Sequence, residues 1–125
     1  MSNDRLAQFT NQKYLNLESY RRNGRGVRTP LWFVEDNGAL YFYTPAHSYK
    51  VKRIAANPRV RVAPCDLRGN VKGARIDATA RRIHGEESRR ANELLDRKYG
   101  LAKRILNFLA RLRGHKRAAF AIEID

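Results

Sequence analysis

The sequence lacks long apolar runs and is poor in cysteine. No apolar run approaches the roughly 20 residues that a membrane-spanning helix needs, and Met1–Arg5 does not lead into the apolar core of a secretory signal. Cys65 is the single cysteine, so neither an intrachain disulfide nor a cysteine-based zinc site can form. These absences predict a cytoplasmic protein without a membrane partner.

Patterns for self-contained catalysis or metal binding are also missing. The histidines His47, His84 and His115 show no metal-ligand spacing, and Asp66 and Asp77 are not part of a paired-carboxylate pattern. No Ser-His-Asp arrangement can be argued from spacing, and neither the Rossmann nor the Walker glycine-rich fingerprint occurs. If the protein is an enzyme, a bound cofactor must carry the chemistry.

Positive charge is what the chain has in excess. It holds 26 Lys and Arg against 12 Asp and Glu, a net charge of +14. Most of the basic residues lie in the clusters Arg21–Arg28, Lys50–Arg61 and Arg97–Arg117. Such a field attracts nucleic acid, an acidic lipid surface or a phosphorylated cofactor, and net charge alone does not choose among them.

The 125 residues predict a single domain, residues 1–125, of mixed α+β class. Alternating apolar and β-branched residues predict strands over Tyr14–Tyr20, Val27–Glu35, Ala39–Thr44, Arg59–Pro64, Ala74–His84 and Ala118–Ile124. Helical spacing predicts helices over Asp4–Phe9, from an N-cap at Ser48 to Ala56, over Glu86–Tyr99 and over Leu101–Leu112. The expected architecture is a mostly antiparallel barrel with short peripheral helices. A basic helix-turn-helix module would need far more helix in the first two-thirds.

The stretch from Leu31 to Pro58 carries the clearest functional signal. Two aromatic strands flank the hairpin turn Asp36-Asn37-Gly38, and a basic helix follows whose first turn presents Ser48 and Lys50. A flavin-type ring needs a flat apolar wall, and its phosphate needs fixed positive charge near a helix start. The residues therefore predict a cofactor site between these strands and this helix.

Three pieces of the chain occur in the order found in a known superfamily. The first is Ser-x-Lys-x-x-x-aliphatic-x-x-Asn-Pro at Ser48–Pro58, which follows the hairpin Leu31–Thr44. The second is Gly24–Phe33, and the third is Ala80–His84 ahead of a helix that ends at Lys98–Gly100. Together they resemble the split β-barrel flavin and deazaflavin proteins, the superfamily that includes pyridoxamine-phosphate oxidase. Within it, the chain is similar to a subgroup of small proteins described as coenzyme F420-dependent enzymes.

The resemblance implies a split-barrel homodimer with a cofactor, coenzyme F420 or FMN, in a groove between subunits. It implies an oxidoreductase that transfers a hydride between that cofactor and a small organic substrate. The cofactor-binding residues expected on this basis are Arg25, Val27, Arg28, Thr29, Pro30, Trp32, Tyr43, Ser48, Lys50, Lys52 and Arg53. No catalytic residue is expected among the side chains. The C-terminal arginine-rich substrate motif of pyridoxamine-phosphate oxidases is absent, so vitamin B6 oxidation is not expected.

Two alternatives remain open at this stage. One is a nucleic-acid-binding protein that uses the basic stretch Arg97–Arg117, although aromatic residues that could stack on bases are scarce there. The other is a non-catalytic flavin- or haem-binding relative with the same fold.

Overall fold

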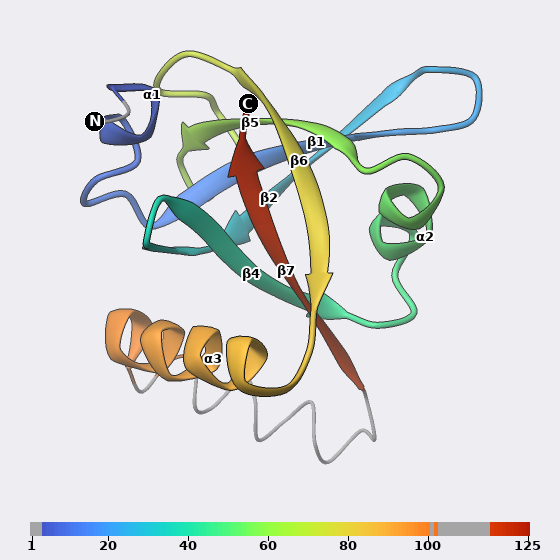
Figure 1. Ribbon diagram of the computed structural model, residues 1–125. Helices are drawn as coiled ribbons and strands as arrows, with labels where there is room; N and C mark the ends of the chain where they lie inside the picture. Colours follow the sequence, from blue (N-terminus) through green and yellow to red (C-terminus); the bar gives the residue numbers. More distant parts are fainter. Residues whose placement is uncertain (1–3, 101, 103–115) are drawn as a thin grey trace.

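The computed structural model describes residues 4–100, 102 and 116–125 (Figure 1). Seven strands of this described part form one antiparallel sheet in the order β2-β1-β5-β6-β7-β4-β3. The strands are β1 Tyr14–Tyr20, β2 Gly26–Trp32, β3 Val34–Asp36, β4 Ala39–Pro45, β5 Arg59–Cys65, β6 Ile76–Ile83 and β7 Arg117–Ile124. The helices are α1 Asp4–Ala7, α2 Tyr49–Ala56 and α3 Gly85–Tyr99.

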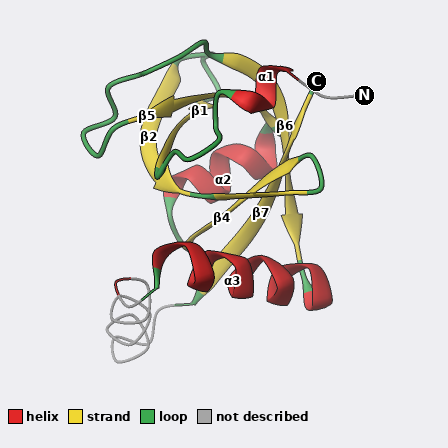
Figure 2. Cartoon of the chain, turned by 90° about the vertical axis from the view of Figure 1, so that its left-hand side faces the viewer, coloured by secondary structure: helices red, strands yellow, loops and turns green. Residues whose placement is uncertain are grey.

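The sheet curls until its two ends approach each other. Strand β2 contacts β4, although the two are not neighbours in the hydrogen-bonded order. Figure 2 shows α2 against the curled sheet and α3 along β4 and β7. The protein is thus an α+β split barrel, as the sequence predicts, and its split lies where the sheet stays open between the edge strands β2 and β3.

The core fills the interior of the barrel. Leu15 and Leu17 of β1 are fully buried there, as are Phe42 and Phe120, which pair across β4 and β7 with ring centroids 5.3 Å apart. From α2, the apolar pair Val51 and Ile54 reaches into the same cluster because three residues on a helix nearly complete one turn. Burial of this pair fixes which face of α2 is left for solvent.

Helix α3 packs on the outside of the barrel. Its Ala91 meets Ala119 and Ala121 of β7, whose small side chains let the helix approach the strand closely. Tyr41 and Tyr43 of β4 are half-buried against the same cluster. These two hairpin aromatics therefore already have a packing role within one chain.

One predicted strand is wrong as a single element. The range Val27–Glu35 divides at Phe33 into β2, which pairs with β1, and β3, which pairs with β4. The physical reason is that the two halves serve opposite ends of the curled sheet, so the chain must turn between them. The other predicted strands and the first three predicted helices agree with the structure to within about two residues at each end. The predicted helix Leu101–Leu112 lies outside the described residues.

Helix α2 starts as the sequence predicts, with Ser48 at the N-cap position. The Ser48 hydroxyl does not cap a backbone N–H; it lies 3.4 Å from Thr44 Oγ1.

Within the described ranges, no helix is long and apolar enough to cross a membrane.

Candidate functional site

The predicted site residues on β2 divide between two faces of that strand. Val27 and Thr29 lie opposite Ser19 and Leu17 of β1 and share the core-facing side of the sheet. Arg28, Pro30 and Trp32 alternate with them and point to the outer side. A planar ring lying against β2 can therefore contact one of these two sets, but not both.

Helix periodicity separates the predicted basic residues of α2 in the same way. At 100° per residue, Lys50 and Lys52 lie about 160° of arc apart around the helix axis when counted by the shorter way round. Lys50 and Arg53 are about 60° apart by the same count, and so are neighbours. Ser48 precedes the helix and lies close to Thr44. The structure thus places Lys50 and Arg53 on neighbouring positions around α2, with Ser48 just before the first turn and Arg53 in the last turn, and leaves Lys52 on another flank.

Lys50 and Arg53 are two adjacent cations, and none of the described acidic residues forms an ion pair with either. Burial lowers the pKa of Lys50, and the nearby Arg53 lowers it further. Burial also lowers the pKa of Arg53, with a smaller contribution from Arg21. Arg53 donates from Nε to the buried hydroxyl of Ser19 at 2.8 Å, and neither cation has a carboxylate partner among the residues that the structure describes. The local potential therefore favours a bound anion.

Thr44 is a residue of this site that sequence reasoning missed. It is buried at the end of β4, with its hydroxyl near that of Ser48. The predicted residue Tyr43 points to the opposite face of β4, where its hydroxyl donates to the carbonyl of Ser88 on α3 at 2.6 Å. The sequence could have indicated that Thr44 and Tyr43 differ in this way, because adjacent residues on a strand face opposite sides of the sheet.

A groove of about 520 Å³ runs between α2 and the end of β1. Its walls include two tyrosines and four cations, namely Tyr20, Arg21, Arg22, Tyr49, Lys52 and Arg53. We call it the α2 groove. The two segments that form it, residues 19–34 and 37–65, contain no Asp or Glu. Arg21 and Arg22 stand out in the sequence as part of a basic cluster, but their position beside α2 depends on the tertiary fold.

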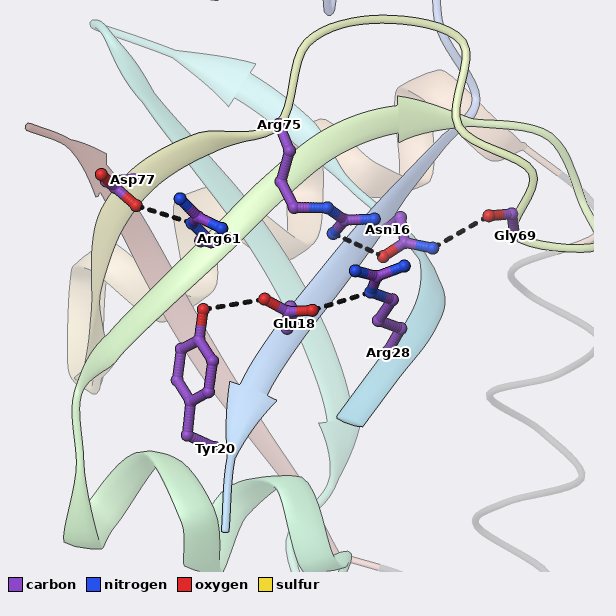
Figure 3. Close-up of polar contacts among 8 residues, drawn as sticks. All are labelled: Asn16, Glu18, Tyr20, Arg28, Arg61, Gly69, Arg75 and Asp77. Carbon is purple, nitrogen blue, oxygen red and sulfur yellow. Dashed lines mark hydrogen bonds and ion pairs between the residues drawn. The ribbon is translucent and has the colours of Figure 1, made fainter. Parts of the chain in front are cut away.

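A polar network occupies the outer face of β1 and β2 (Figure 3). Glu18, only 7% exposed, accepts hydrogen bonds from Arg28 Nε at 2.7 Å and from the Tyr20 hydroxyl at 2.8 Å. Burial raises the pKa of Glu18, but these two hydrogen bonds and the charge of Arg28 outweigh it, so the net pKa is lowered. A Cβ on Gly26 would lie 2.8 Å from the Glu18 side chain, so only glycine fits there without a shift.

The same network holds the loop between β5 and β6. Arg75 donates to Asn16 Oδ1 at 3.0 Å, and the Asn16 amide donates to the carbonyl of Gly69 at 2.9 Å. Within this network Arg28 forms an ion pair with Glu18, whereas no described acid pairs with Lys50 or Arg53. In the described part of the chain, no three His, Cys, Asp or Glu side chains lie together as metal ligands would.

The end of α3 clamps the junction between β2 and β3. The Tyr99 hydroxyl accepts from the N–H of Phe33 at 2.9 Å and lies 2.6 Å from the carbonyl oxygens of Phe33 and Lys13. The Tyr99 ring stacks on Trp32 at 4.7 Å between centroids, and burial raises the pKa of its hydroxyl. Lys98 donates to the Phe33 carbonyl at 2.9 Å, and burial lowers the pKa of Lys98 to about 8. The predicted residue Trp32 is thus held by α3.

Comparison with known proteins agrees with this architecture. The sequence matches the pyridoxamine 5'-phosphate oxidase family over residues 3–124. The chain belongs to this family. A search of curated proteins finds none that matches the sequence.

Solved structures show the same fold at low sequence identity. The chain is similar to HutZ, the heme storage protein of Vibrio cholerae, with a TM-score of 0.74 and 16% identity over 95% of this chain and 86% of that one. It is similar to the F420-H2 dependent reductase FDR-A, with a TM-score of 0.65 and 22% identity over 89% and 94% of the two chains. It is also similar to a structure described as a domain-swapped dimer, with a TM-score of 0.64 and 22% identity over 89% of this chain and 80% of that one.

Proposed function

We propose that the protein binds coenzyme F420 or FMN and acts as an oxidoreductase. It would transfer a hydride between that cofactor and a small organic substrate. Membership of the pyridoxamine 5'-phosphate oxidase family and similarity to FDR-A support the cofactor class. The observation that carries the proposal is the pair Lys50 and Arg53, two partly buried cations without a carboxylate partner in the described part of the chain.

The residues before α2 and along one flank of it fit a phosphate group. Lys50 and Arg53 offer positive charge, and Ser48 and Thr44 offer hydroxyl groups beside the positive end of the helix dipole. No acidic residue lies in the first turn of α2 to oppose an anion. When bound, the cofactor supplies the hydride chemistry, and the chain's own residues bind and orient it.

The core-facing side of β2 is the proposed wall for the ring. Val27 and Thr29 are half-buried there and lie on the strand that borders the split of the barrel. Arg25, on the turn before β2, is proposed to meet the anionic tail of the longer cofactor. The outer-face residues Arg28, Pro30 and Trp32, together with Tyr43 and Lys52, stay predictions as cofactor ligands.

Assembly and location complete the proposal. We propose a homodimer, which the similar domain-swapped dimer supports, and a cytoplasmic location. A second candidate is haem binding without catalysis, which the structural similarity to HutZ favours. The visible absorbance spectrum of the purified protein separates the three cofactors, because flavin, deazaflavin and haem absorb in different bands.

The direct test is titration with FMN and with coenzyme F420, followed by fluorescence. The variant carrying Lys50→Met and Arg53→Met should bind both cofactors more weakly. Arg68 and Lys72 are exposed cations on the β5–β6 loop, away from the α2 groove, so their double substitution by Met removes the same charge as a matched control. Equal affinity of the first variant, the control and the unmodified protein would refute the assignment of the phosphate site.

A further inference from the structure

The α2 groove combines an exposed aromatic ring with clustered cations. Tyr49 is 76% exposed, the highest value among the large apolar side chains that the structure describes. The Lys52 ammonium lies 5.5 Å from the centroid of its ring. A ring so placed adds little to the core and presents a flat face to solvent. Flat aromatic faces among cations are the elements on which unpaired nucleobases stack.

The cations follow the length of the groove. Tyr49, Lys52, Arg53 and Ala56 line it from α2, spaced along about 10 Å of helix, and Arg21 and Arg22 line it from the other side. None of the lining residues is acidic. Arg21 and Arg22 have no carboxylate partner among the described residues, so their charge is available to successive phosphates.

We infer that the α2 groove binds single-stranded nucleic acid, with a base on Tyr49 and the phosphate backbone along Arg21, Arg22 and Lys52. A duplex fits the observations less well, because a base must be unpaired to stack on a side chain. The net charge of +14 draws the polyanion to the surface, and the groove supplies the specific contacts. The groove shares Arg53 with the proposed phosphate site, but Lys50 lies on a different flank of α2 from Lys52 and does not line the groove.

The test is fluorescence anisotropy with labelled ten-nucleotide oligothymidylate and oligouridylate, which compare DNA with RNA in the same groove. Tyr49→Ala should weaken binding at least about fivefold, since stacking on an aromatic side chain contributes that much or more per base, and Tyr49→Phe should retain it. Replacing Arg21 and Arg22 by Ala should weaken oligonucleotide binding across the salt range from 50 to 200 mM. The same double substitution should also make the slope of log affinity against log salt less negative by about 1.4.

Controls separate this inference from the cofactor proposal and from bulk charge. Lys50→Met should keep oligonucleotide affinity, and the Tyr49 and Arg21/Arg22 variants should keep FMN affinity, which also shows that they fold. The Arg68 and Lys72 double variant removes two charges elsewhere and should change the slope much less. Unchanged binding by Tyr49→Ala, or an equal slope change in that control, would each overturn the inference.

Discussion

Single substitutions at Lys50 and Arg53 should weaken cofactor binding alike but shift stability in opposite directions. Lys50→Met keeps the buried aliphatic stem and removes a charge that burial and Arg53 both disfavour. Arg53→Met also removes a charge, but it leaves the hydroxyl of Ser19, 1% exposed, without its donor. The two variants therefore separate a residue that serves binding alone from one that also serves the fold.

The magnitudes follow from the contacts. Each variant loses a charge-assisted hydrogen bond to phosphate, about 1.5–3 kcal/mol, so affinity should fall roughly 10- to 150-fold. For the cofactor-free protein, relief of like-charge repulsion at a partly exposed site should add about 0.5 kcal/mol in Lys50→Met. Leaving a buried hydroxyl unpaired should remove about 1–3 kcal/mol in Arg53→Met. In a chain of 125 residues, about 1 kcal/mol corresponds to about 4 °C in Tm. The expected shifts are about 2 °C upward and about 4–12 °C downward.

The assay pairs thermal unfolding of the cofactor-free protein with titration of FMN and coenzyme F420. Lys72→Met, an exposed lysine outside the site, should change neither quantity. A Lys50→Met variant that melts lower than the unmodified protein would show that this lysine is compensated in the fold. Retained affinity for both cofactors in that variant would refute its assignment to phosphate, whatever its stability.

Three other measurements probe the clamp, the polar network and the assembly. Tyr99→Phe should lower the free energy of unfolding by about 1–3 kcal/mol in a urea titration, because the N–H of Phe33 loses its acceptor; Tyr14→Phe, the same deletion without a described hydrogen bond, should not. Glu18 has a folded-state pKa below 4.5, so its stabilising effect is present above that pH and is lost as the pH falls through the lowered value. Glu18→Gln should therefore cost stability at neutral pH, and the cost should shrink in acid; a constant cost would contradict a role for the ionised form. Light scattering at micromolar concentration should give twice the 14.5 kDa of one chain, and a monomer with cofactor bound would exclude the proposed dimer.

Local patterns were enough to predict most of the fold. Period-two alternation located the strands, and the N-cap Ser48 with Pro58 bounded α2. The break at Phe33 could not be predicted in this way, because Trp32, Phe33 and Val34 all favour a strand. What turns the chain there is the pairing of β2 and β3 with different strands, together with the hydroxyl of Tyr99, 66 residues away.

Local patterns also predict part of the candidate site. Helix periodicity, available from sequence alone, already puts Lys50 and Lys52 on different flanks of α2. Strand alternation likewise separates Thr44 from Tyr43. The approach of Arg21 and Arg22 to α2 is different in kind, because it depends on how the end of β1 meets a helix that follows it by some 30 residues.

The two faces of β2 bear on where a ring can lie. On the outer face, Arg28 is paired with Glu18 and Trp32 is stacked on Tyr99, so a ring there would have to displace contacts within the chain. On the core-facing side, Val27 and Thr29 are only half-buried although they point toward the barrel. That side therefore has contact surface left to offer, and it lies on the strand that borders the split. The free-energy cost of binding a ring is lower where no existing contact must be broken, which favours the inner face of β2.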